Sequence, residues 1–276
     1  VLLLQLTLMR ALSVARYHHF SYLVISTALL GFGASGTFLS IYYERLKDKF
    51  TFWADTFLVL FTLSIPLSYT AARVLPIDVR YLFFSWGQGL LLLLYNLLMF
   101  VPFFFGALII GLFLTHYSAR IPVLYGINLF ASGLGGIGAL GLMFLFPAER
   151  LPLVVPTAAC AALLFRLPAN IVQRYRGKRF TAAGMAAALA AALAVTAAAV
   201  MLPVPGEIDR YKALSYLRSL EAQGDAERVA TRHGPRMRLD IYDAPSLHHT
   251  LFVSPGSGSV PPPQLAILAD GEMAGT

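Results

Sequence analysis

The chain has 276 residues, of which 58% are hydrophobic and only 13% are charged, and its formal net charge is +7. A soluble globular protein carries about 25% charged residues, so this composition excludes an ordinary soluble domain and indicates a polytopic membrane protein. Because Cys160 is the only cysteine, an intramolecular disulfide and a thiolate metal cluster are also excluded.

Pro203 separates two regions of different composition. Residues 1–202 hold 14 lysines and arginines against 5 acidic residues, whereas residues 203–276 hold 7 against 9. The positive excess therefore belongs to the apolar region, where it reports membrane orientation and does not indicate nucleic-acid binding. We expect a transmembrane helical domain over 1–202 and a soluble segment over 203–276, which we call the tail.

The apolar region predicts an all-α bundle of about seven membrane helices, because a helix needs about 20 apolar residues to cross a bilayer. The seven blocks are 1–15, 20–42, 52–74, 83–116, 121–146, 151–172 and 180–202, the first being only partly long enough. In the fourth block, Pro102 near the middle predicts one helix kinked at that residue. Two short helices that form a hairpin are the alternative.

The distribution of basic residues between the loops predicts the orientation. The loops after the second, fourth and sixth blocks carry nine lysines and arginines, against five in the loops after the first, third and fifth. By the positive-inside rule the first set lies in the cytoplasm and the tail lies outside. An enzyme that uses a cytosolic cofactor would need the opposite orientation.

Small residues recur at helical spacing in two blocks. The stripes are Thr27, Gly31 and Ser35 in one block and Ala131, Gly135 and Ala139 in the other. Such residues allow helix backbones to approach closely in lipid. We interpret both stripes as packing surfaces within the chain, with a pore or a sliding interface as the alternative.

Polar side chains inside the blocks are scarce. The uncharged ones are Gln88, Asn96 and Asn128. We expect them to bond neighbouring helices, with a small-molecule site as the alternative.

Asp55 is interpreted as a charge near a helix start. His18 and His19 are interpreted as interfacial anchors, because adjacent helical residues point about 100° apart and make poor joint metal ligands. This scarcity argues against an ion-coupled transporter.

The tail combines one helical pattern with strand patterns. Residues 207–223 predict an amphipathic helix that ends at Gly224. In 237–242, apolar residues alternate with Arg238, Asp240 and Tyr242, which predicts a half-buried strand. Residues 264–269 predict a second strand, closed by the tight-turn dipeptide Asp270–Gly271. Two or three strands cannot bury a full core, so we expect the tail to open a larger, truncated domain.

The tail contains no motif for catalysis or ligand binding. No G-x-G-x-x-G turn joins a strand to a helix, and the pair His248–His249 lacks further zinc ligands. Ser246 and Ser254 lack the turn of a nucleophilic serine. Asp240 and Asp243 are interpreted as a solvated strand edge. We therefore predict no catalytic, cofactor-binding or metal-binding residue in this chain.

Several short segments spread along the chain carry a likeness to a known family. They are 8–14 (LMRALSV), 17–20 (YHHF), 28–36 (ALLGFGASG), 101–106 (VPFFFG), 124–129 (LYGINL), 211–215 (YKALS), 238–242 (RLDIY) and 262–271 (PPQLAILADG). Together they resemble bacterial membrane-bound spermidine-synthase-like proteins. The family more often has Asp where Asn128 stands.

The resemblance implies that the tail contains the connecting segment and first β-hairpin of a Rossmann-like aminopropyltransferase or methyltransferase domain. In that family, S-adenosylmethionine or its decarboxylated form sits on a Gly-rich turn after the next strand, and that turn is not present before Thr276. This chain alone is then expected to hold no cofactor and to be catalytically inactive.

The implied function is that of an integral module of the bacterial inner membrane, which anchors a transferase domain and contacts the lipid bilayer and a polyamine or an amphiphilic small molecule. The alternatives are a small-molecule or lipid transporter whose tail is regulatory, and a purely structural anchor.

Overall fold

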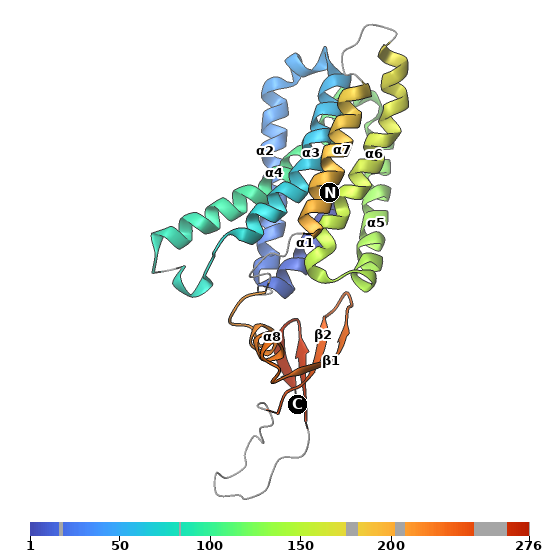
Figure 1. The fold of residues 1–276 in the computed structure, drawn as a ribbon. Helices are drawn as coiled ribbons and strands as arrows, with labels where there is room; N and C mark the ends of the chain where they lie inside the picture. The colour runs from blue at the N-terminus through green and yellow to red at the C-terminus, as the bar shows by residue number, and fades with distance from the viewer. Residues whose placement is uncertain (17–18, 83, 175–181, 202–207, 246–263, 276) are drawn as a thin grey trace, which may run out of the picture.

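The computed structural model describes the chain except for residues 17–18, 83, 175–181, 202–207, 246–263 and 276. It shows a helical bundle with a small sheet beyond one end (Figure 1). The bundle helices are α1 (Leu2–Ala15), α2 (His19–Lys47), α3 (Phe50–Val74), α4 (Trp86–His116), α5 (Ile121–Leu145), α6 (Leu151–Arg174) and α7 (Ala182–Met201). Short 3-10 turns connect some of them: η1 (Val79–Tyr81), η2 (Ser118–Arg120) and η3 (Ala148–Arg150).

Four helices in the described part of the chain are long and apolar enough to cross a membrane. They are Phe20–Lys47, Phe50–Val74, Trp86–His116 and Ser118–Leu145. Leu2–Ala15 and Leu189–Ala198 are shorter apolar helices. The predicted membrane-type helical architecture is thus found with four candidate spans. The predicted number of seven spans is not confirmed by the described helices.

The helix α4 stays continuous through Pro102. It runs for 31 residues from Trp86 to His116, which at about 1.5 Å per residue gives a length of about 46 Å. The prediction of one helix is therefore confirmed and the alternative hairpin is wrong. Together with α3 it forms a pair that extends from the side of the bundle in Figure 1.

The small residues on α2 pack against α4. A Cβ atom added at Gly31 would lie 2.8 Å from the Cβ atom of Phe103, which is fully buried. One turn earlier, Thr27 Oγ1 lies 3.2 Å from the amide oxygen of Asn96. The predicted packing stripe is thus confirmed, as is the predicted interhelical role of Asn96.

The helix α5 is packed on one side only. Gly135 approaches the backbone of Leu3 in α1, and Ala139 is fully buried, so the predicted stripe on α5 is a packing surface. The glycines of α5 on other faces have no described atom within 4 Å of an added Cβ. Only 11% of its candidate span is buried, so most of the helix surface is not covered by other described parts of the chain.

In its described residues, the tail forms one helix and a four-stranded antiparallel sheet of order β1-β2-β3-β4. The elements are α8 (Ala213–Gln223), β1 (Glu227–Arg232), β2 (Leu239–Asp243), β3 (Leu265–Ala269) and β4 (Glu272–Gly275). Leucines of α8 pack on the inward side chains of the sheet, including Tyr242 and Leu268. The described tail therefore buries a small core of its own, with more strands than the two or three expected.

Both predicted turns of the tail are confirmed. Helix α8 ends at Gly224, whose φ of 86° is left-handed, as expected for a glycine after a helix. Asp270 and Gly271 have φ values of 49° and 83° between β3 and β4, and two successive positive φ values are what a two-residue hairpin requires.

Two predictions for the tail are wrong in detail. The predicted helix over 207–223 begins only at Ala213, because Asp209 donates its backbone N–H to the carbonyl of Ala15, 2.8 Å away. In β2 the polar residues face inward: Asp240 and Tyr242 are 0% exposed, whereas Met237 is 44% exposed. Asp240 is therefore not a solvated strand edge.

Candidate functional site

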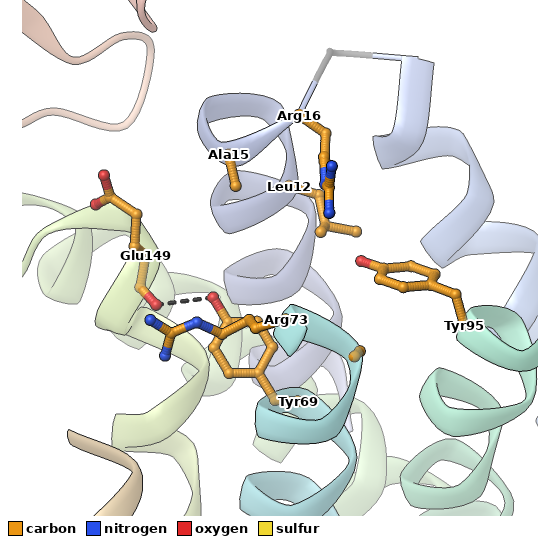
Figure 2. A pocket seen from close by; sticks show the side chains of 8 residues that line it. Leu12, Ala15, Arg16, Tyr69, Arg73, Tyr95 and Glu149 are labelled. Carbon is orange, nitrogen blue, oxygen red and sulfur yellow. Dashed lines mark hydrogen bonds between the residues drawn. The ribbon is translucent and has the colours of Figure 1, made fainter. Parts of the chain in front are cut away.

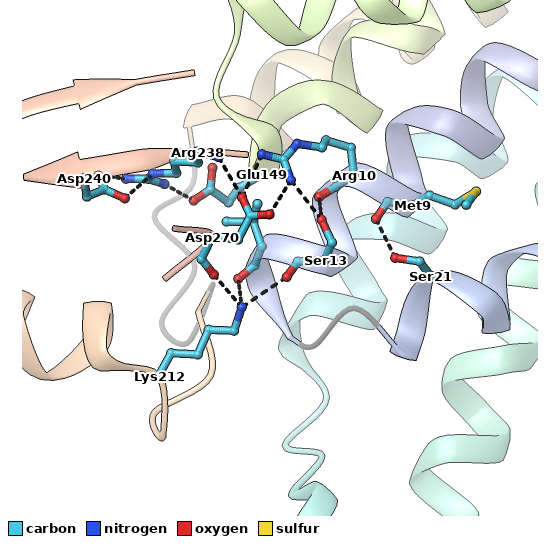
Figure 3. A network of polar contacts seen from close by, with 10 residues as sticks. Met9, Arg10, Ser13, Ser21, Glu149, Lys212, Arg238, Asp240 and Asp270 are labelled. Atoms are coloured by element: carbon cyan, nitrogen blue, oxygen red, sulfur yellow. Dashed lines mark hydrogen bonds and ion pairs between the residues drawn. The ribbon is translucent and has the colours of Figure 1, made fainter. Parts of the chain in front are cut away.

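A cluster of charged side chains lies where the tail meets the bundle. We call this cluster the docking network, and Figure 3 shows its members converging from α1, η3 and the tail. It comprises three cations and three anions, Arg10, Lys212, Arg238, Glu149, Asp240 and Asp270. The opposite charges balance, so the cluster as a whole is electrically neutral.

Arg10 binds the tip of the β3–β4 hairpin. Its guanidinium donates two parallel hydrogen bonds to the carboxylate of Asp270, with N···O distances of 2.9 and 2.8 Å. The same guanidinium donates to the hydroxyl of Ser13 at 3.1 Å. Arg10 is 7% exposed. Because a two-point bond between two planar groups fixes their relative orientation, this pair sets the angle at which the hairpin meets α1.

Lys212 caps the last turn of α1. Its ammonium donates to the backbone carbonyls of Ser13 and Val14 in the helix, and to that of Asp270 in the hairpin, over 2.7–3.1 Å. The last carbonyls of a helix have no partner within the helix and attract a cation. Burial lowers the pKa of Lys212, although the carboxylates of Glu272 and Asp270 act in the opposite direction.

Arg238 joins the sheet to η3. Its guanidinium donates to the carboxylate of Glu149 and, at 3.0 Å, to that of Asp240. All three residues are at most 4% exposed. Burial alone would lower the pKa of Arg238, but the carboxylates of Glu149 and Asp240 outweigh it and raise that pKa. The buried carboxylates therefore hold this guanidinium in its charged form.

The first described residues after 202–207 form a second contact with the bundle. Arg16 lies 3.7 Å from the carboxylate of Asp209 and also donates to the carbonyl of Ile77 at 3.0 Å. Asp78 pairs with Arg210 and accepts a hydrogen bond from the hydroxyl of Tyr211 at 3.1 Å. The tail therefore contacts the loop ends after α1, α3 and α5, which all lie at one end of the bundle.

One cavity that adjoins the docking network, between α1, α3, α4 and Glu149, is too small for an organic ligand. Its volume is about 20 Å³, which is about the space of one water molecule. Figure 2 shows the side chains around it, with the hydroxyl of Tyr69 donating to the carbonyl of Glu149 at 2.7 Å. Arg73 lies over the ring of Tyr69, 5.5 Å from its centroid. The hydrogen bond of Tyr69 connects α3 to η3 and holds Glu149, a member of the docking network, against α3.

A larger cavity of about 450 Å³ lies between helices and is open on one side. It is bounded by α1, α2, α4 and α5, and its polar lining includes Gln5, Asn128 and Ser132. Gln88 differs from Asn128, because its side-chain oxygen accepts a hydrogen bond from the backbone N–H of Asp78 at 2.9 Å. The alternative of a small-molecule site is thus favoured for Asn128 and not for Gln88.

The remaining candidates from the sequence are distributed as follows. Asp55 is 1% exposed in the second turn of α3. His18, Ser246, Ser254 and the pair His248–His249 lie outside the described residues. Among the residues that the structure describes, no group of three or more His, Cys, Asp or Glu side chains could hold a metal ion.

Local sequence reasoning missed the docking network. Arg10 and Asp270 are 260 positions apart, and Glu149 and Arg238 are 89 positions apart. The sequence did contain one indication of the network. Arg238 and Asp240 lie on the same face of a predicted strand, and charges on such a face must meet either water or opposite charges.

Comparison of the chain with protein-family models, with curated proteins and with solved structures finds no match. The function of the docking network must therefore be inferred from the residues themselves.

Proposed function

We propose that this chain is the membrane module of a bacterial spermidine-synthase-like protein, which holds a transferase domain in one orientation at the surface of the inner membrane. The observation that carries the proposal is the docking network. Its buried ion pairs join the end of the bundle to the segment in which the soluble domain would begin.

The segments that resemble the family support this proposal, because their charged residues meet in the network. Arg10 and Ser13 belong to segment 8–14, and Lys212 to segment 211–215. Arg238 and Asp240 belong to segment 238–242, and Asp270, in the turn after β3, belongs to segment 262–271. Residues that are scattered along the sequence and carry the likeness thus share one physical role, which is to fix the tail on the bundle.

Buried ion pairs suit an orienting role better than a purely stabilising one. Desolvation offsets much of their attraction, yet removing one partner of such a pair costs about 3–5 kcal/mol. A docking surface built from such pairs therefore favours the one position of the tail in which all charges are paired, because any other position separates them. A flexible tether would need none of these contacts.

In the proposed protein, all seven bundle helices are embedded in the inner membrane. The contacts of the tail with Arg16, Asp78 and Glu149 support this arrangement, because they bring the loops after α1, α3 and α5 to the end that holds the tail. These are the loops with fewer basic residues, so the positive-inside rule assigns the tail to the outside. That side is opposite to the one that an enzyme using a cytosolic cofactor would need, so the proposal of a transferase domain rests on the docking network and not on this charge bias.

The residues described in the tail do not fit the cofactor of the family. The strands β1 to β4 are joined in antiparallel order, whereas S-adenosylmethionine-type cofactors are held in the family on a Gly-rich turn that leads from a strand into a helix. The proposal therefore assigns cofactor, polyamine or amphiphile chemistry to a domain that follows the tail, and it derives no reaction step from this chain.

The rival function is the handling of a lipid or another small amphiphile within the membrane. The cavity of about 450 Å³ beside Asn128 favours it. Its amide and hydroxyl lining could bind a polar headgroup, while ionisable side chains, which ion-coupled transport uses, are not among its lining residues.

Reading the coding DNA beyond the codon for Thr276 tests the proposal. We expect a strand, a Gly-rich turn into a helix, and an acidic residue about 20 positions further on. A stop codon directly after Thr276 in an intact gene would contradict the proposal and leave amphiphile handling as the better account.

A further inference from the structure

A basic cleft opens beside the docking network, between η3 and the sheet. Its volume is about 340 Å³. It is lined by Pro147, Glu149, Arg150, Arg218, Arg228, Thr231, His233 and Arg238. Four guanidinium groups thus share the cleft with one carboxylate, so its lining carries a strong positive excess even with His233 neutral.

Two of these arginines are available for a ligand. Arg238 is held by Glu149 and Asp240, and Arg228 pairs with Glu221 at 2.9 Å. Arg150 and Arg218 form no ion pair with any residue that the structure describes. An anion in the cleft would therefore meet guanidinium donors that are not already used by the fold.

His233 supplies a second, independent indication of a ligand. Its Nδ1 atom is buried and has no hydrogen-bond partner among the described residues. A buried polar atom without a partner destabilises a fold unless something else satisfies it. An oxygen of a bound phosphate group would satisfy this nitrogen in the tautomer that carries its proton on Nδ1.

The position of the cleft relative to the membrane indicates which kind of molecule carries the anion. The candidate span of α5 ends at Leu145, and the lining of the cleft begins two residues later at Pro147. The side chains of Leu140, Phe144 and Leu145 near this end of α5 are exposed. The cleft therefore opens where an apolar, lipid-facing surface gives way to polar residues, which is the level of phospholipid headgroups.

We propose that the basic cleft binds the phosphate group of an anionic phospholipid, whose acyl chains lie along the exposed face of α5. A free phosphate ion offers the same oxygens to the arginines. Only the lipid also covers the apolar surface that adjoins the cleft, so we assign the site to the lipid. This inference does not depend on a transferase domain.

Native mass spectrometry of the whole chain, purified in detergent, tests the proposal. The probes are phosphatidylglycerol, phosphatidylcholine and, in a separate arm, inorganic phosphate. The test variant is the double substitution Arg150→Gln/Arg218→Gln, which leaves the docking network intact. The matched control is Arg45→Gln/Arg120→Gln, which removes the same charge from exposed arginines of α2 and η2. Circular dichroism checks that each variant is folded.

We expect the wild-type protein to prefer phosphatidylglycerol over phosphatidylcholine. The Arg150→Gln/Arg218→Gln variant should bind phosphatidylglycerol about tenfold more weakly, in line with the contribution of basic residues near an anionic lipid surface, and the control should bind it as the wild type does. Equal affinities in all three proteins would overturn the proposal. Displacement of the lipid by an equal concentration of inorganic phosphate would overturn the lipid assignment.

Discussion

Arg10 in the first helix and Asp270 at the tip of the last hairpin are joined by two parallel hydrogen bonds of 2.9 and 2.8 Å, across 260 positions of sequence. The pair connects a residue of the helical bundle to a residue beside the sheet of the tail. Lys212 strengthens the same junction, because its ammonium binds carbonyls on both sides. The junction between the two regions is thus a defined polar interface.

We expect Lys212→Met to loosen the tail. The substitution keeps the length of the side chain but removes the donor from three carbonyls, and each unsatisfied buried group costs about 1–3 kcal/mol. Amide hydrogen exchange of the peptide that covers β3 and β4 should become about tenfold faster or more. Lys47→Met is the matched control, because that exposed ammonium pairs only with Glu44 among the described residues. Unchanged exchange in Lys212→Met would contradict the capping role.

Two glycines with nearly equal positive φ angles allow a matched test of the hairpin tip. Gly224 and Gly271 have φ values of 86° and 83°, so alanine at either position carries a similar strain of about 1–2 kcal/mol. An added Cβ at Gly271 would also lie 3.1 Å from Cδ of Lys212, whereas none of the described atoms lies within 4 Å at Gly224.

We therefore expect Gly271→Ala to expose the tail to limited proteolysis, and Gly224→Ala to leave the junction protected while fraying the end of α8. Equal protease sensitivity of the two variants would mean that the hairpin tip does not take part in docking.

The folding of the tail should depend on pH through His233. Burial and the neighbouring guanidinium of Arg238 lower the pKa of this histidine below its usual 6.5. The unfolded chain therefore takes up the proton at a higher pH than the folded protein does. The contribution to stability is complete above pH 6.5 and is lost as the pH falls through the folded pKa.

Thermal unfolding between pH 8 and pH 5, in detergent without lipid, measures this effect. The melting temperature of the wild type should fall on acidification relative to that of His233→Gln, which does not titrate in this range. Parallel curves for the two proteins would contradict the burial of the His233 ring that lowers its pKa.

Local patterns in the sequence predicted the features that neighbouring residues decide. The continuity of α4, the helix end at Gly224 and the turn at Asp270–Gly271 follow from apolar length and from backbone preferences. The facing of β2 did not follow, because its apolar residues were expected to point inward. Arg238 and Asp240 face inward instead, because Glu149, 89 positions before Arg238, supplies a partner that no local pattern contains.

The packing stripe on α2 was predicted for the same local reason, whereas its partner was not. Small residues at Thr27, Gly31 and Ser35 indicate a close approach, but only the structure identifies Phe103 and Asn96 of α4 as the neighbours. In the same way, single charged residues at Arg10 and Lys212 gave no sign of the network they form together. Long-range pairs of charges were the part of the site that the sequence alone could not provide.

A double-mutant cycle on Arg10 and Asp270 tests the central claim that this pair fixes the tail on the bundle. The proteins are Arg10→Gln, Asp270→Asn, the double variant and the wild type, and the measurement is the opening free energy of the β3–β4 hairpin from amide hydrogen exchange. We expect each single change to destabilise the hairpin, and the double change to cost less than their sum by about 1–3 kcal/mol. Strictly additive effects would contradict a direct bond between the two residues and, with it, the docked arrangement of the tail.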